Sequence, residues 1–393
     1  MNHPLASALV ATTFSALAVA QTLSSVVAID RNLVYRQGAL PLGTHSPSAC
    51  DLRLAGAAST DHAFAHWWYY RVAGDPRESA LQEDGNVIRA VLGNQIDCDW
   101  RNVSARGLLA AHQVTNVFGD GASGGVVVDR LTLTNISPSA LVVDAFAYTD
   151  FDICGSFLGD SASGDSFGHV VTDASTCGSR ISFRADGNDI SEVTDFNPTY
   201  PAVSIRSRLT DNAVDDLHPW AGNFGPGDYT AAFQWRTRTL APHESMTFQC
   251  WFEGNLTMSC IPRAAARGIA IPGSSTAPIL DASASVITPG SGSRALTASL
   301  RSAPAGRDSL LVLGFAAASI PLPGLVVYVD PTGWLAIPRL VGPSGAVSYD
   351  IPVVDDISLC GAELFMQWFV VDPTAPSGFV SQTTAVDVRL GGL

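Results

Sequence analysis

Acidic side chains gather near the middle of the chain, where they could bind a metal ion. Asp150 and Asp152 follow an apolar run, and Asp160 comes next in a stretch rich in Gly and Ser. Calcium binds several oxygen ligands that loops of this kind present. The residue order does not match an EF-hand loop, which needs Gly at its sixth position and Glu at its twelfth. We expect either a calcium site at Asp150, Asp152 and Asp160 or acids that face solvent in turns.

Two histidines, His62 and His66, are four residues apart. On a helix this spacing would suit a metal pair, but no Glu follows His62 as the HExxH motif requires. On a strand the two side chains also share a face, with Phe64 between them and Trp68 beyond. These aromatic neighbours favour a strand of the core over a metal site.

Glu78 is the candidate acid for hydrolysis of a polysaccharide, which requires two carboxyl groups close together. A surface ion pair with an arginine is the alternative role. Two segments partly match the motifs of other sites, a nucleophile elbow and a dinucleotide-binding loop, but their neighbouring residues do not fit. Residues 159–163 end in Ser where a nucleophile elbow needs Gly. The glycine-rich residues 119–124 lead into a valine run, which predicts a hairpin loop and not a dinucleotide site.

Aromatic side chains are concentrated at Trp67, Trp68, Tyr69 and Tyr70. Neighbouring residues of a strand point to opposite faces, so one of the two tryptophans is exposed if only one face is buried. Exposed aromatic rings can stack on sugar rings. We therefore expect either a ligand-binding surface at Trp67, Trp68 and Tyr70 or aromatic core packing.

The composition excludes several classes of protein. The chain has 393 residues with a formal net charge of −14, which argues against a protein that binds nucleic acid. All 22 basic residues are Arg, so a lysine Schiff base and a P-loop lysine are excluded. Abundant Asp, Gly and Pro with few Glu favour turns over helices.

The N-terminus resembles an export signal. Residues 4–20 carry no charge, and Ala18, Val19 and Ala20 fit a cleavage site before Gln21. We expect a signal peptide over residues 1–20 and a mature protein that is secreted or periplasmic. Beyond residue 20 no apolar run is long enough to predict a membrane span.

Seven cysteines fit an exported protein with disulfides and one thiol left over. Short spacings predict the pairs Cys154–Cys177 and Cys250–Cys260. Elimination then pairs Cys50 with Cys98. We expect Cys360 to be a buried free thiol.

Short alternating runs separated by turn residues predict an all-β protein. Residues 126–134 are one such run, and others recur at short intervals to the C-terminus. Residues 263–278 are rich in Pro, Gly, Ser and Ala, as linkers are. We expect two antiparallel β-sandwich domains, a larger one with the disulfides at 30–262 and a smaller one at 279–393.

The C-terminal stretch around Cys360, from 311–314 through 360–368, resembles a β module that recurs in exported bacterial proteins. Residues 66–71 and 133–137 are similar to another exported β domain of a family of unknown function. The resemblance implies an exported β-sandwich protein and no particular activity.

Together these patterns favour a non-catalytic exported protein for surface structure, adhesion or glycan binding. Its partner would be a glycan or another component of a cell surface. The alternative is a secreted hydrolase that acts on polysaccharide with a pair of carboxylates. The two differ in geometry, because a hydrolase needs a concave site with converging carboxyls, one of them with a raised pKa.

Overall fold

The computed structural model describes residues 25–38, 49–156, 159–165, 168–172, 177–195, 204–219, 222–273, 277–283, 286–287 and 294–392. The described chain is built almost wholly from β-strands, and it holds one short α-helix, α1 (Ile205–Thr210). The predicted all-β class is therefore confirmed. No helix in these ranges is long and apolar enough to cross a membrane. The expected signal peptide, residues 1–20, lies outside the described residues.

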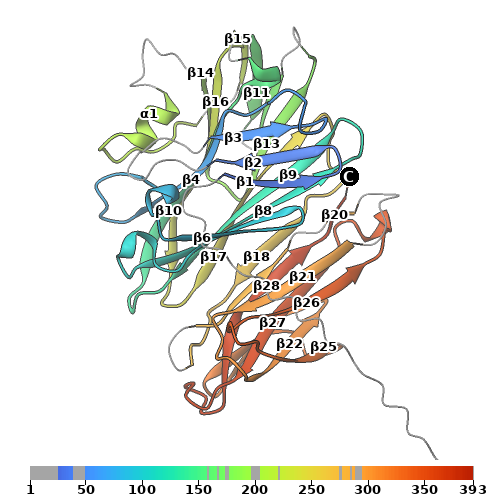
Figure 1. The fold of residues 1–393 in the computed structure, drawn as a ribbon. Helices are drawn as coiled ribbons and strands as arrows, with labels where there is room; N and C mark the ends of the chain where they lie inside the picture. Colours follow the sequence, from blue (N-terminus) through green and yellow to red (C-terminus); the bar gives the residue numbers. More distant parts are fainter. Residues whose placement is uncertain are drawn as a thin grey trace, which may run out of the picture.

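The first part of the chain folds into three antiparallel sheets (Figure 1). The largest has nine strands in the order β15-β11-β12-β13-β17-β9-β8-β7-β6, and a five-stranded sheet, β14-β16-β10-β4-β5, packs against its inner face. A small sheet, β1-β2-β3, completes the core. The strands are β1 (Val26–Asp30), β2 (Leu33–Gln37), β3 (Cys50–Arg53), β4 (Ala65–Val72), β5 (Ser79–Ala80), β6 (Val87–Leu92), β7 (Gln95–Trp100), β8 (Leu109–Gly119), β9 (Gly125–Asn135), β10 (Leu141–Asp150), β11 (Asp160–Asp165), β12 (Gly168–Thr172), β13 (Arg180–Asp186), β14 (Ile190–Asp195), β15 (Gly222–Gly227), β16 (Tyr229–Leu240) and β17 (Ser245–Gly254).

The second part, orange to red in Figure 1, lies beside the first. Its main sheet has the order β18-β28-β27-β22-β25, and a three-stranded sheet, β19-β21-β26, accompanies it. Two small pairs, β23-β24 and the parallel β20-β29, complete it. The strands are β18 (Arg263–Arg267), β19 (Ile279–Ala282), β20 (Val286–Ile287), β21 (Arg294–Arg301), β22 (Asp308–Gly314), β23 (Ala317–Leu322), β24 (Leu325–Val329), β25 (Leu335–Leu340), β26 (Val347–Val353), β27 (Glu363–Val371), β28 (Val380–Arg389) and β29 (Gly391–Gly392).

Buried apolar side chains form separate clusters in the two parts. One cluster runs from Val26 to Phe252, and another from Ala264 to Leu390 around Trp368. Residues 263–267, at the start of the expected linker, form β18 and pair with β28 of the second part. Residues 263–267 thus form an edge strand of the five-stranded sheet of the second part.

The disulfides differ in part from the prediction. Cys154 pairs with Cys177 as predicted, but Cys260 pairs with Cys360 and not with Cys250. Cys250 lies inside β17, where its side chain points into the core, whereas Cys260 lies beyond the strand near Leu390. Cys50, Cys98 and Cys250 are buried free thiols, so the predicted pair Cys50–Cys98 and the free Cys360 were wrong.

Candidate functional site

The predicted aromatic ligand surface is not a surface. Trp67 and Trp68 are 0% exposed and Tyr70 is 2% exposed. They lie on β4, which has β10 on one side and β5 on the other and is covered on both faces. Trp67 packs edge-on against Trp100, and Trp68 packs against Trp235. The sequence shows that these side chains alternate but not that both faces are covered. The predicted ligand surface was therefore wrong, and the alternative, aromatic core packing, is what the structure shows.

The predicted calcium ligands do not converge. Asp150 ends β10 and is 5% exposed; burial raises its pKa well above the ordinary value, and the charges of Asp228 and Asp152 raise it further. Asp160 is fully buried at the start of β11. In the described ranges, three groups of His, Cys or acidic residues bring ligand atoms within 4.8 Å of one another, and Asp150, Asp152 and Asp160 belong to none of them.

Glu78 lies in a buried charge network. Its Oε1 accepts a hydrogen bond from Arg71 Nη1 at 2.6 Å, and Arg71 also pairs with Asp144 and Asp216. Burial raises the pKa of Glu78, although backbone hydrogen bonds and Arg71 oppose that shift. The expected partnership with an arginine is present, but Glu78 is 1% exposed, so the pair is not on the surface.

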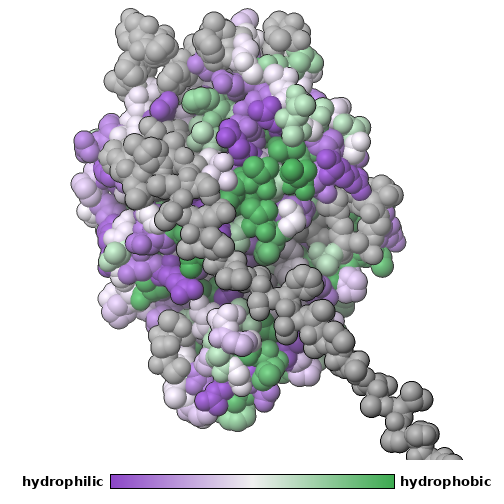
Figure 2. Space-filling view, viewed as in Figure 1, coloured by the Kyte–Doolittle hydropathy of each residue, from purple (hydrophilic) through white to green (hydrophobic). Residues whose placement is uncertain are grey.

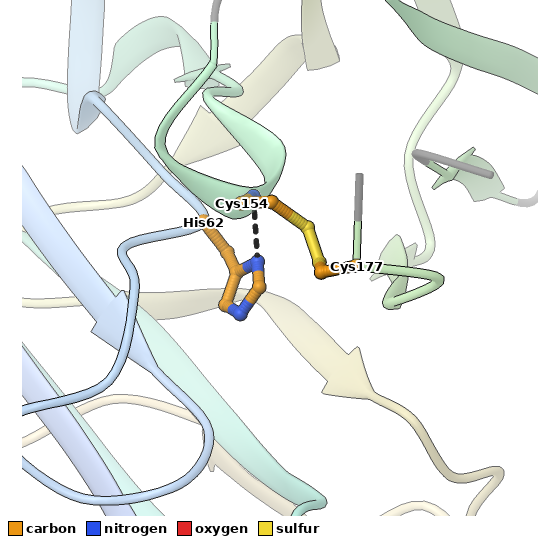
Figure 3. Close-up of side chains that lie close together, drawn as sticks. All are labelled: His62, Cys154 and Cys177. Atoms are coloured by element: carbon orange, nitrogen blue, oxygen red, sulfur yellow. Dashed lines mark hydrogen bonds between the residues drawn. A yellow bond between two sulfur atoms is a disulfide. The ribbon is translucent and has the colours of Figure 1, made fainter. Parts of the chain in front are cut away.

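His62 and His66 have different partners and do not form a metal pair. His62 Nδ1 accepts a hydrogen bond of 3.1 Å from the backbone N–H of Cys154, next to the Cys154–Cys177 disulfide (Figure 3). Both sulfurs are consumed by the disulfide, so this group offers no thiolate to a metal. Burial and the charge of Arg53 lower the pKa of His62 to about 4. His62 is therefore a neutral side chain that fixes the turn holding Cys154.

A groove of about 780 Å³ lies between the two parts of the chain, and we refer to it as the groove. Its walls come from β1 and β6–β8 on one side and from β19 and β21 on the other. The lining combines polar or charged residues with apolar ones: Ile29, Asp30, Arg31, Ala90, Leu92, Gly93, Asn94, Gln95, Asp97, Asn116, Phe118, Asp281, Ser283, Ala295, Thr297, Ser299 and Arg301.

The apolar rim is accessible to solvent. Ile29 is 52% exposed and Leu92 is 62% exposed. β6 is the edge strand of the nine-stranded sheet, and its last residues face outward. Hydrophobic residues also form a patch among hydrophilic ones on the face shown in Figure 2. The groove thus offers a ligand both polar groups and a small apolar surface.

Charged side chains from both parts meet at the floor of the groove. His112 Nε2 lies 2.9 Å from Asp97 Oδ1 and 2.7 Å from Arg301 Nη2. Asp281 Oδ1 lies 3.8 Å from His112 Nδ1 on the other side of the ring. Arg130 is buried beneath them and donates to the Ala282 carbonyl oxygen at 2.8 Å. These contacts join the first part of the chain to the second.

The surroundings of Asp97 at this floor favour its ionised form. Burial raises the pKa of Asp97, but hydrogen bonds from His112 and Gln95 and the nearby Arg301 outweigh that effect and lower the pKa. A second cavity, of about 430 Å³, lies on the other side of the network, and His112 and Asp281 line it. The network therefore separates two cavities along the contact between the parts.

Carboxyl groups with raised pKa values lie elsewhere. Among the residues that the structure describes they are Asp61, Asp150, Asp152, Glu78 and Asp387, and none of these five lines the groove. Burial raises the pKa of Asp61 to about 6, although three hydrogen bonds from backbone N–H groups act to lower it. A general acid needs a raised pKa at the site of the reaction. Asp97, whose pKa is lowered, is therefore not suited to act as a general acid in the groove.

Sequence reasoning did not identify the groove. Asp97 and His112 lie on neighbouring strands of one hairpin, but Asp281 and Arg301 come from a region more than 150 residues later. Alternation along β7 and β8 is visible in the sequence and places Asp97 and Asp99 on one face. The signal that was lacking is the packing of β19 and β21 against that face.

Comparisons with known proteins give distant structural likenesses alone. Neither the protein-family models nor the curated protein sequences gave a match to the chain. A bacterial glucoamylase complexed with acarbose is similar with TM-score 0.39 and 7% identity, over 61% of this chain and 32% of that chain. A polysaccharide lyase is similar with TM-score 0.30 and 10% identity, over 92% of this chain and 47% of that chain. The chain thus spans less than half of each, and likenesses at these TM-scores assign no function.

Proposed function

We propose that this chain is a non-catalytic exported protein that binds a glycan in the groove. The observation that supports this most directly is the composition of the groove, which gathers polar side chains from both parts around Asp97, a carboxyl group whose pKa is lowered. Small-molecule sites combine a concave shape with a few polar groups that fix the ligand's orientation.

The side chains of the groove suit a ligand rich in hydroxyl groups. Asn94, Gln95 and Asn116 carry amides, and Thr297 and Ser299 carry hydroxyls. An amide can donate to or accept from a sugar hydroxyl, and a carboxylate can accept a hydrogen bond from one. The charge of Arg301 is opposed within the groove by Asp97, whose pKa it lowers, so binding does not require a charged ligand. The exposed rim at Ile29 and Leu92 can cover the apolar face of a sugar ring.

Export is part of the proposal. The uncharged residues 4–20 and the two disulfides are typical of secreted or periplasmic proteins. N-terminal sequencing of protein recovered outside the cytoplasm should begin near Gln21. A sequence that begins at Met1 would contradict export by a cleaved signal.

The alternative is hydrolysis of the bound polysaccharide, and one experiment separates the two functions. Fluorescently labelled protein is applied to a glycan array, and the glycans it retains are then incubated with the protein and assayed for new reducing ends. We expect retention of one class of glycan and no release of reducing ends. Release that is lost in Glu78→Gln would establish the hydrolase instead, and the absence of any retained glycan would contradict glycan binding.

A further inference from the structure

A second cluster of ligand-type side chains lies deep in the first part, away from the groove. His66 on β4, Asp129 on β9 and Cys250 on β17 are each 0% exposed. Asp129 and Cys250 are directly opposite each other on neighbouring strands, and His66 reaches them from the facing sheet. The side chains of two sheets thus bring an imidazole, a carboxylate and a thiol together.

The three ligand atoms are nearly spaced for one metal ion. His66 Nε2 lies 2.9 Å from Asp129 Oδ2 and 4.0 Å from Cys250 Sγ, and all three atoms lie within 4.8 Å of one another. Zinc binds imidazole nitrogen and carboxylate oxygen at about 2.0 Å and thiolate sulfur at about 2.3 Å in a tetrahedral arrangement. Such bonds place the ligand atoms about 3.3–3.6 Å apart, so each of the two distances from His66 Nε2 would change by about half an ångström.

Neutral donors hold the carboxylate of Asp129 in place. Trp68 Nε1 donates to its Oδ2 at 2.7 Å, and Thr115 Oγ1 donates to its Oδ1 at 2.8 Å. Gln113 Nε2 donates to both oxygens, at 2.9 and 3.0 Å. Hydrogen bonds of this kind to a ligating carboxylate are typical of the outer shell of metal sites.

Charge also favours a cation here. In the described part of the chain, the His66 ring is the one group within ion-pair distance of Asp129, and no guanidinium reaches it. A buried carboxylate without a cation is costly, and the cost falls when a positive charge is supplied. A divalent cation bound to the Asp129 carboxylate and the Cys250 thiolate would leave the core neutral.

Two buried polar atoms beside the cluster make no hydrogen bond. The Tyr35 hydroxyl is fully buried and lies close enough to four side chains for their charges to act on it: Cys50, Asp129, Cys250 and Cys98. The second nitrogen of His66, Nδ1, is also buried and has no hydrogen-bond partner. Buried polar groups are ordinarily satisfied, and an ion bound to the Tyr35 oxygen would satisfy that hydroxyl, whereas His66 Nδ1 is not one of the ligand atoms.

We propose that His66, Asp129 and Cys250 bind one zinc-class divalent cation as a structural site. Its mixed nitrogen, oxygen and sulfur ligands match this class of ion and not calcium, which prefers oxygen ligands alone. On binding, the Cys250 thiol releases its proton, and the proton of His66 moves from Nε2 to Nδ1, so that each donor atom offers a lone pair. We assign the fourth position to the Tyr35 hydroxyl, which is buried and without a hydrogen-bond partner. Because the site is fully buried, the ion enters during folding.

The test measures metal in the full chain refolded with Zn²⁺ and then freed of loose metal by gel filtration. We expect one zinc per chain by mass spectrometry, and loss of that zinc in Cys250→Ser. The matched control is Cys50→Ser, because Cys50 is also a buried free thiol but lies outside the three ligands. We expect Cys50→Ser to retain the zinc.

A spectroscopic measurement keeps the proposal testable if Cys250→Ser does not fold. Refolding the unmodified chain with Co²⁺ should produce the near-ultraviolet charge-transfer band of a thiolate bound to cobalt. Absence of both that band and stoichiometric zinc would overturn the proposal. Equal loss of metal from Cys50→Ser and Cys250→Ser, with both proteins folded, would overturn the assignment of Cys250. Neither outcome bears on glycan binding, which the groove carries independently.

Discussion

Removing the Cys260–Cys360 disulfide should destabilise the protein more than removing Cys154–Cys177. The first bridge joins residues 100 apart in sequence, and the second joins residues 23 apart. In the chain-entropy model, closing the long loop stabilises the folded state by about 4.7 kcal/mol, and closing the short loop stabilises it by about 3.4 kcal/mol. The long loop contains β18 to β26, so its closure constrains most of the second part.

The assay compares two double variants, Cys260→Ala with Cys360→Ala and Cys154→Ala with Cys177→Ala. Neither leaves an unpaired thiol from the bridge. Urea unfolding followed by tryptophan fluorescence reports the second part through the buried Trp368 and the first through Trp67 and Trp68. We expect the larger loss of unfolding free energy, by about 1 kcal/mol, for the Cys260 and Cys360 pair. Peptide mapping without reduction that links Cys260 to Cys250 would refute the reasoning, as would a smaller loss for the long loop.

Two further predictions concern buried charge. Arg71→Met should lower the unfolding free energy by about 3–5 kcal/mol, because it removes the counter-ion of buried Glu78 and its neighbouring acids. The control Arg36→Met removes an arginine that is more exposed, and it should cost under about 1 kcal/mol. Equal losses of the two variants in chemical denaturation would contradict this. His62 has a pKa lowered to about 4, so the folded state binds fewer protons than the unfolded state between about pH 4 and 6.5 and stability rises with pH there. Asp61 has a pKa raised to about 6, so it makes stability fall with pH between about 4 and 6. Melting curves across pH 4–7 should therefore show a shallower rise for His62→Gln and a steeper one for Asp61→Asn than for the unmodified protein, and unchanged slopes would contradict these assignments.

Local patterns in the sequence predicted much of the fold. The alternation at residues 126–134 became β9, and turn-rich intervals correctly separated the strands. The Cys154–Cys177 disulfide was also predictable, because its two cysteines are only 23 residues apart in the sequence. Period and spacing carry this information, since each depends on residues close in the chain.

Features that depend on how sheets pack were not predictable. Whether Trp68 is exposed depends on the nine-stranded sheet that covers β4, and the partner of Cys260 depends on where the turn before β27 lies. The groove and its charge network need β19 and β21 against β7 and β8. The sequence shows which residues are present, but it does not show how distant segments align with one another. That alignment is set when whole faces of the sheets are buried against each other.

Blocking the groove tests the central claim most directly. Ala90 lies exposed on edge strand β6 and lines the groove, so Ala90→Trp fills it with little effect on the core. The matched control is Ala336→Trp, at an exposed alanine of edge strand β25 outside the groove. In calorimetric titration with a glycan retained on the array, we expect Ala90→Trp to weaken binding at least about tenfold, or about 1.4 kcal/mol, and Ala336→Trp to bind as the unmodified protein does. Equal affinity of Ala90→Trp and the unmodified protein would contradict a ligand site in the groove.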